Sequence, residues 1–246
     1  MPKPEDRPSG ATEAALQQAL AAAQEAEARS RRFLADAAHQ LRNPIAGVHA
    51  CGEALLHGPN PTDRDRLLGE LLRETTRARR LLASLLQMAR LDQGQGVTPA
   101  ECDIVGLCRE EADRMWVLAP HLDVVLRVDL AGRQPQVDAG AVREALANIL
   151  DNGRRHAATS ITMTVTAAEE WLEIQVADDG PGMTPEVAER AFQRFVSLDG
   201  KGGSGLGLPI ALGLARAHGG NLTYDHRAFV LRLSLRPEPD PPAAEG

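Results

Sequence analysis

The chain has 246 residues, of which 43% are hydrophobic and 25% charged, and this is the composition of an ordinary soluble globular protein. Such a composition excludes a chain that is disordered from end to end. No stretch approaches the roughly 18 apolar residues that a membrane span requires. The net charge of −7 gives no reason to expect a nucleic acid as partner.

Residues 1–10 are polar and proline-rich, which is not the pattern of a secretory signal peptide. We therefore expect a cytoplasmic protein that contacts a membrane only if a sensor part precedes this chain. The three cysteines (Cys51, Cys102 and Cys108) include no CxxC pair, which favours reduced thiols.

Residues 11–57 predict one long helix, rich in Ala, Gln and Glu at its start and kinked at Pro44. A turn at 58–61 (GPNP) separates it from a second helix, for which Thr62 is the expected N-cap and which ends near Leu91. Two helices joined by such a short turn form an αα-hairpin.

Both helices carry apolar residues at heptad spacing. The two tracks of the first helix are Leu34, Leu41, Val48 and Leu55, and Ala38, Ile45 and Gly52; the seam of the second is Leu68, Leu71, Thr75, Ala78, Leu82, Leu85 and Ala89. Additional leucines make the second stripe wider than one partner helix can bury. We therefore predict a homodimer through residues 30–92, in which two hairpins form a four-helix bundle.

After a linker-like segment at 92–96 (DQGQG), the pattern changes to mixed helices and strands. Expected helices cover 103–115, 138 to beyond 156, a segment that begins near Pro185 behind a Thr184 cap, and 206–217; expected strands cover 123–130, 161–166, 171–177, 222–224 and 229–235. The expected domains are an N-terminal segment at 1–29, a helical domain at 30–92, an α/β domain at 97–236 and a disordered tail at 237–246.

A first polar cluster surrounds His39 in the segment FLADAAHQLRNP. On a helical wheel His39 lies about 140° from the apolar stripe, and Asn43, Asp36 and Arg32 share that outer face. His39 is therefore not a packed core histidine. A neutral imidazole nitrogen in such a position is a nucleophile that can attack a γ-phosphate.

A second polar row lies on the helix expected from 138. Glu144, Asn148, Asn152 and His156 recur every four residues and therefore share one face. Such a row can be simply a solvated face. Two asparagines one turn apart also offer neutral oxygens to a Mg²⁺ ion whose shell is completed by phosphates and water.

Two glycine-rich segments follow. The segment VADDGPGM at 176–183 ends a predicted strand; an acidic residue there can accept a hydrogen bond from an adenine amino group, and the glycines let the backbone pass close to the base. The segment GGSGLGL at 202–208 leads into a helix, an arrangement that suits phosphate. A Rossmann site is excluded because no strand precedes these glycines and no βαβ unit surrounds them.

In this order, the segments resemble the conserved boxes of sensor histidine kinases, over residues 30–235. The sequence from His39 to Pro44 (HQLRNP) resembles the H box, usually written H-E-L-R-[TN]-P, and the row from Glu144 to His156 resembles the N box. Residues 178–183 resemble the G1 box, and residues 202–208 resemble the G2 box. Between them, AFQRFV, with Phe192 and Phe195, resembles the F box. His218-Gly-Gly resembles the closing turn of the family.

This resemblance implies a dimerisation and phosphoacceptor domain followed by a catalytic domain of the Bergerat type, an α/β sandwich that binds ATP and Mg²⁺. The implied reaction transfers the γ-phosphoryl group of ATP to His39 and then to an aspartate of a response regulator. By the same match Asn152 is the magnesium ligand and Asp178 reads adenine, whereas Asp179 is a solvated neighbour.

The remaining nucleotide-binding residues also follow from the match. Asn148 is expected near the ion and the phosphates, Arg155 at a phosphate, and His156 against the nucleotide. The other positions in the expected site are Gly180, Gly182, Lys201, Gly203, Gly205, Leu206 and Gly207. Of these, Lys201 either reaches the γ-phosphate or is a solvated lysine of the lid.

Gln40 departs from the family pattern, because many members have a glutamate there that is thought to act as base toward the histidine. A glutamine amide cannot take up that proton. Either the kinase is slow or dependent on activation, or Asp36, one turn earlier on the same face, orients the imidazole. Asn43 matches a position associated with dephosphorylation of the regulator, which predicts a bifunctional kinase and phosphatase.

Two alternative functions remain open. A catalytically weak pseudokinase would act as a dimeric module that binds a response regulator, and Gln40 is the feature that favours it. An ATPase of the gyrase or Hsp90 class would use ATP for conformational work, but such a protein needs no phosphoacceptor histidine.

Overall fold

The computed structural model describes residues 10–94, 96–168, 170–196 and 203–235. By packing, the chain divides into two compact units, one through Leu81 and one from Leu82. The division falls inside a helix, before the linker expected at 92–96, and the functional domain boundaries stay predictions. In the described parts of the chain, no helix combines the length and the apolar character that crossing a bilayer would need.

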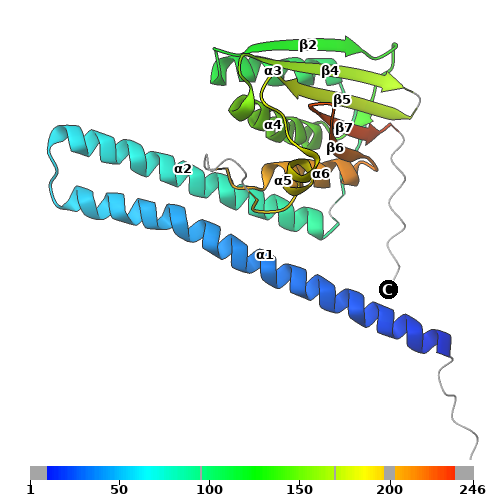
Figure 1. The fold of residues 1–246 in the computed structure, drawn as a ribbon, viewed down its shortest axis with the longest axis horizontal. Coiled ribbons are helices and arrows are strands. Elements are labelled where there is room, and N and C mark those ends of the chain that lie inside the picture. Colours follow the sequence, from blue (N-terminus) through cyan, green and yellow to red (C-terminus); the bar gives the residue numbers. More distant parts are fainter. Residues whose placement is uncertain (1–9, 95, 169, 197–202, 236–246) are drawn as a thin grey trace, which may run out of the picture. The chain divides into compact units, whose positions relative to one another are not determined.

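The first unit is built on a helical hairpin. Helix α1 (Gly10–Leu56) and helix α2 (Pro61–Asp92) are joined by a short turn at Gly58, which has a φ of +67° (Figure 1). Helix α1 continues through Pro44 without interruption. In the middle of the hairpin, a methyl group on Gly47 of α1 would lie 3.0 Å from Cγ of Glu74 in α2.

The N-cap of α2 is Asn60, so the expectation of Thr62 is wrong. The Asn60 side-chain oxygen accepts a hydrogen bond from the backbone N–H of Asp63 at 2.9 Å. Pro61 then occupies the first helical position, where its missing N–H costs nothing and its fixed φ suits the helix.

The buried face of α1 also differs from the expected tracks. Ala37, Pro44 and Cys51 are buried and recur at heptad spacing. Leu34 and Ile45, which belong to the predicted tracks, remain 62% and 59% exposed. The single hairpin therefore buries one apolar stripe of α1 and leaves a neighbouring stripe without cover.

The second unit contains a sheet with helices on one of its faces (Figure 1). Its elements are β1 (Ala100–Glu101), α3 (Ile104–Leu118), β2 (Asp123–Asp129), β3 (Gln136–Val137), α4 (Ala139–His156), β4 (Ser160–Ala168), β5 (Trp171–Asp178), α5 (Pro185–Ala191), α6 (Gly207–Ala217), β6 (Asn221–Asp225) and β7 (Ala228–Ser234). The sheet has the order β2-β4-β5-β7-β6, in which only β2 and β4 are parallel. This arrangement confirms the expected α/β sandwich.

The core of this unit lies between the sheet and helices α3, α4 and α6. Alternate residues of β4 and β5 point into it and are at most 2% exposed, and these are Ile161, Met163, Val165, Leu172, Ile174 and Val176. The two-residue strands β1 and β3 pair with each other and were not expected from the sequence. They are too short for an alternating pattern to show.

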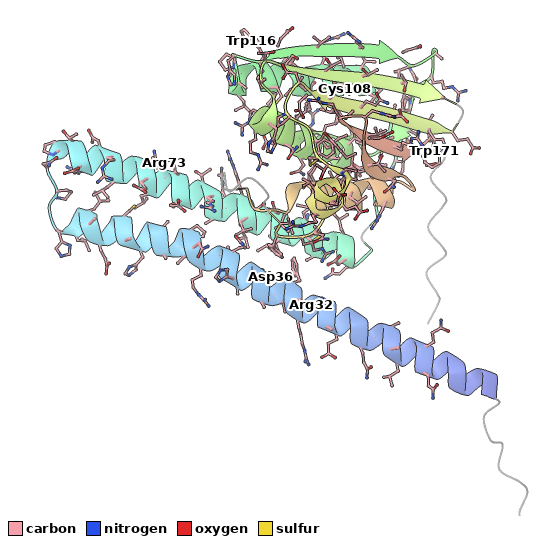
Figure 2. The ribbon with its side chains drawn as sticks, viewed as in Figure 1. Arg32, Asp36, Arg73, Cys108, Trp116 and Trp171 are labelled. Carbon is pink, nitrogen blue, oxygen red and sulfur yellow. The ribbon has the colours of Figure 1, made fainter. Side chains whose placement is uncertain are left out.

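All three cysteines are free and buried. Cys108 lies within the second unit (Figure 2), and burial raises the pKa of its thiol to about 12. A thiol with that pKa is protonated at neutral pH and therefore a poor nucleophile. The reduced state of the cysteines stays a prediction.

Candidate nucleotide site and phosphoacceptor helix

The polar row of α4 lies on the side of the helix that its apolar residues leave free. Glu144, Asn148, Asn152 and His156 are all partly exposed, whereas Leu146 and others on the opposite side are buried. The Asn148 side-chain nitrogen donates to the carbonyl of Glu144 at 3.0 Å. The amide oxygen of Asn148 therefore stays available to a neighbouring group.

The loop after β5 runs against the last turn of α4. A carboxylate oxygen of Asp178 accepts a hydrogen bond from the backbone N–H of Gly180 at 3.0 Å. A methyl group on Gly180 would collide with the backbone carbonyl oxygen of His156. Only glycine permits this approach, and it brings Asp178 and His156 into one site.

Asp179 is more than the solvated neighbour expected from the sequence. Although exposed, its carboxylate accepts hydrogen bonds from the backbone N–H groups of Ala158, Thr159 and Ser160 and from the Thr159 hydroxyl. The bonds from Thr159, with those from its neighbours, hold the pKa of Asp179 well below its usual range. Asp179 thus fixes the turn between α4 and β4 beside the site, a role that no local pattern indicates.

The second glycine segment reaches the same face of α4. Gly203 lies against the guanidinium of Arg155, and a methyl group on Gly207 would be 3.0 Å from the Asn148 amide oxygen. Gly205 has a φ of +67°, and its carbonyl accepts from the backbone N–H of Phe195 at 2.9 Å. The structure therefore brings the predicted N, G1 and G2 segments together.

Leu206 and Lys201 are the two remaining predicted residues of this segment. Leu206 is completely buried, so its side chain packs in the core and cannot itself contact a ligand. Leu206 is the N-cap residue of α6, and among the residues that the structure describes no side chain caps the N-terminus of that helix. The first N–H groups of α6 therefore offer donors suited to a phosphate. Lys201 lies outside the described residues.

Two residues that the sequence analysis did not single out contact the loop after β5. The Tyr224 hydroxyl accepts from the backbone N–H of Met183 at 3.1 Å, and Arg227 donates to the carbonyl of Gly180. The F-box residue Phe192 packs edge-on against Phe229, with ring centroids 6.3 Å apart. These contacts join residues about 40 positions apart, which local patterns do not reveal.

The phosphoacceptor candidate lies on α1 in the first unit. His39 is exposed, as the helical wheel predicts, and so are Asp36 and Asn43, whereas Gln40 is half-buried. Figure 2 labels Asp36 on this helix. Within the described residues, no hydrogen bond or ion pair joins Asp36 to His39. The imidazole of His39 is thus exposed, and Asp36 does not contact it in this structure.

The donor set at α4 fits a magnesium ion that arrives with a nucleotide. Among the residues that the structure describes, no three or more His, Cys, Asp or Glu side chains gather into a metal site. The neutral protein oxygens on this face are the side-chain amide oxygens of Asn148 and Asn152, and the Glu144 carboxylate lies one turn before Asn148. An ion there would take most of its ligands from phosphates and water, which is the usual magnesium arrangement.

The sequence matches two family models. One is the His Kinase A (phospho-acceptor) domain, over residues 29–94. The other is described as histidine kinase-, DNA gyrase B-, and HSP90-like ATPase, over residues 137–239. The first match includes His39, and the second includes the α4 row and both glycine segments.

Similar proteins match across most of the chain. The probable sensor histidine kinase TcrY of Mycobacterium tuberculosis is 30% identical over 231 residues, which cover 88% of this chain and 48% of TcrY. The signal transduction histidine-protein kinase AfsQ2 of Streptomyces coelicolor is 30% identical over 242 residues, which cover 89% of this chain and 44% of AfsQ2. The chain thus spans about half the length of these relatives.

Solved structures share the fold. The Acinetobacter baumannii histidine kinase AdeS has a TM-score of 0.68 at 18% identity, covering 80% of this chain and 98% of AdeS. The histidine kinase ThkA, in complex with the response regulator TrrA, has a TM-score of 0.71 at 19% identity, covering 87% of this chain and 65% of the ThkA chain. Since both domain models match in the family's order around His39 and the α4 site, the chain belongs to the sensor histidine kinases of two-component systems.

Proposed function

We propose that the protein is an ATP-dependent histidine kinase that phosphorylates His39 and passes the phosphoryl group to an aspartate of a response regulator. The observation that carries this proposal is that two glycine segments, far apart in the sequence, both lie against the polar face of α4. Gly180 lies against His156, Gly203 against Arg155 and Gly207 against Asn148. Because glycine has no side chain, the backbone of both segments lies close to the polar side chains of α4, where its N–H groups can bind a phosphate.

Each part of that face has a role toward ATP. Asp178 accepts a hydrogen bond from the adenine amino group, and Arg155 and the uncapped N-terminus of α6 bind phosphate. His156 would lie beside the nucleotide, and Asn148 near the ion and the phosphates. Asn152 would hold a magnesium ion, which would neutralise charge on the phosphates.

The transfer itself needs little covalent chemistry from the protein. A neutral nitrogen of His39 attacks the γ-phosphorus, the bond to the β-phosphate oxygen breaks, ADP leaves, and the imidazole proton passes to a base or to water. Positioning supplies most of the rate. Because Gln40 cannot take up that proton, we propose Asp36 as the group that orients the imidazole.

We further propose that the active protein is a homodimer and that its partner is a receiver domain of a response regulator. The stripe of apolar residues that the hairpin leaves exposed supports the dimer. Asn43, exposed one turn after His39, is proposed to position a water for dephosphorylation of the regulator. Because ATP is the phosphoryl donor, we place the reaction in the cytoplasm.

The test is incorporation of labelled phosphate from Mg-ATP into the wild type, His39→Ala and His49→Ala. His49 is a matched control, because it is exposed on the same helix. We expect acid-labile label in the wild type and in His49→Ala, and none in His39→Ala. Label that resists acid, or that persists in His39→Ala, would contradict the proposal. Nucleotide binding without label in any of the three proteins would favour the pseudokinase, which Gln40 makes the second candidate.

A further inference from the structure

The hairpin between β6 and β7 turns through two residues that are unusual for its geometry. His226 and Arg227 have φ values of +44° and +66°. A two-residue turn with positive φ at both positions is of type I′ and strongly favours Asn-Gly. A residue with a side chain is strained at positive φ, so the backbone conformation of this turn does not explain why His226 and Arg227 occupy it.

Arg227 uses this conformation to reach the loop after β5. Its guanidinium donates a hydrogen bond to the carbonyl of Gly180. From the same hairpin, the Tyr224 hydroxyl accepts from the backbone N–H of Met183 at 3.1 Å. Between these two points, a methyl group on Gly182 would lie 3.2 Å from the Tyr224 hydroxyl and 3.5 Å from Nε of Arg227.

Tyr224 is itself held in place by aromatic packing. Its ring meets that of Phe229 edge-on, with centroids 5.0 Å apart, and Phe229 in turn contacts Phe192. The hydroxyl therefore occupies a fixed position before any ligand arrives. The loop is bound at Gly180 and at Met183 by one rigid hairpin, and at its start by the bond from Gly180 to Asp178.

We propose that Tyr224 and Arg227 form a clamp that holds residues 178–183 in the shape in which Asp178 reads adenine. The identity of the ligand rests on the proposed function. Tyr224 and Arg227 are positioning residues, because each acts on the backbone of the loop and not on the reacting groups. Its physical effect is to order a Gly-Pro-Gly loop in advance, so that binding does not have to order it.

The matched variants follow from the turn geometry. Arg227→Asn removes the donor to Gly180 and keeps a residue that accepts positive φ. Tyr224→Phe removes the hydroxyl and keeps the ring. His226→Asn is the control, because the His226 side chain is 95% exposed and lies in the same strained turn.

The measurement is calorimetric titration of the full chain with ATP and with GTP, beside thermal unfolding. We expect Arg227→Asn and Tyr224→Phe each to raise the Kd for ATP roughly tenfold, and to narrow the preference for ATP over GTP. We expect the Tm to stay within a few degrees of the wild type, and His226→Asn to bind as the wild type does. An unchanged Kd and preference, with or without a lower Tm, would overturn the clamp.

Hydrogen exchange of the free protein separates this proposal from the proposed function. Loss of the Tyr224 hydroxyl is expected to speed exchange of the Met183 amide, with no nucleotide present. A second outcome is that the wild type binds no nucleotide while the Met183 amide still exchanges faster in Tyr224→Phe. That result would contradict the proposed function but would support the role of Tyr224 in ordering the loop. An unchanged exchange rate in both clamp variants would overturn the clamp whatever the nucleotide affinity.

Discussion

Asp36 and His39 are both exposed on α1 and are three residues apart, so their side chains can meet across one turn. If Asp36 orients the imidazole, Asp36→Asn should slow the initial rate of autophosphorylation about tenfold, which is less than the roughly 100-fold or more that a group transferring the proton itself contributes. Quench-flow labelling with saturating Mg-ATP measures this rate. Glu53→Gln, another exposed carboxylate of the same helix, is the control, and equal rates for Asp36→Asn and the wild type would end the hypothesis.

Asn43 is exposed one turn beyond His39 and carries both a donor and an acceptor, the combination needed to hold a water. We expect Asn43→Ala to keep autophosphorylation within about twofold of the wild type and to slow dephosphorylation of the regulator at least tenfold. The assay follows loss of label from a phosphorylated receiver domain with ADP present. A variant that removes the label as fast as the wild type would show that Asn43 has no phosphatase role.

At the scale of elements, His218 links the end of α6 to the start of α4. One ring nitrogen contacts the carbonyl of Leu214 at 2.9 Å, and the other accepts from the backbone N–H of Asp138 at 3.1 Å. The Asp138 side chain in turn caps α4 by accepting from Ala141. The histidine is 1% exposed and must be neutral to keep its acceptor nitrogen.

This link makes the stability of the second unit depend on pH. Burial lowers the pKa of His218 below its ordinary 6.5. The contribution of His218 to the free energy of unfolding is therefore complete above pH 6.5. It is lost as the pH falls, because the unfolded chain then binds a proton that the folded state does not bind. We expect the free energy of unfolding by urea to fall more steeply between about pH 7 and pH 5 in the wild type than in His218→Asn. His226→Asn, which changes an exposed histidine, should keep the wild-type slope; parallel slopes for all three proteins would contradict the assignment.

The elements themselves were largely predictable, since periodicity and capping are local. The helix with Glu144, Asn148, Asn152 and His156 on one face begins at Ala139 behind Asp138 and ends at His156, close to its expected bounds. Contacts set by the tertiary fold were not predictable. The bonds of Asp179 to residues 158–160 and the reach of Arg227 to Gly180 depend on strand order, which no single segment encodes.

In the helical hairpin, too, the sequence pattern does not predict which residues make the tertiary contacts. Heptad spacing correctly indicates that α1 and α2 carry apolar stripes, but it does not say which stripe faces inward. The buried set contains Pro44, because a proline ring is apolar and fits a close helix contact as readily as an aliphatic side chain. The predicted track with Ile45 is instead left at the surface of the single chain.

At the scale of the whole molecule, the uncovered stripe predicts the oligomeric state. On α2 the exposed leucines are Leu68, Leu72, Leu82 and Leu86, at 41%, 66%, 50% and 57% exposure. Apolar residues in such a row along a helix are typical of a surface that a partner covers. A second copy of the hairpin, related by a two-fold axis, would bury them in a four-helix bundle.

Leu72→Arg tests this bundle away from the phosphoacceptor. Burying a leucine contributes about 1.5–3 kcal/mol, and a symmetric dimer contains the site twice, so the dimer Kd should rise at least a hundredfold. Sedimentation equilibrium should give twice the mass of one chain for the wild type and a single chain for the variant at micromolar concentration. Val117→Arg changes an apolar residue that is 73% exposed on α3, outside the seam, and should stay dimeric. Because the residues of the proposed nucleotide site lie within the second unit, Leu72→Arg should still bind ATP. A wild type that sediments as a single chain would refute the bundle itself.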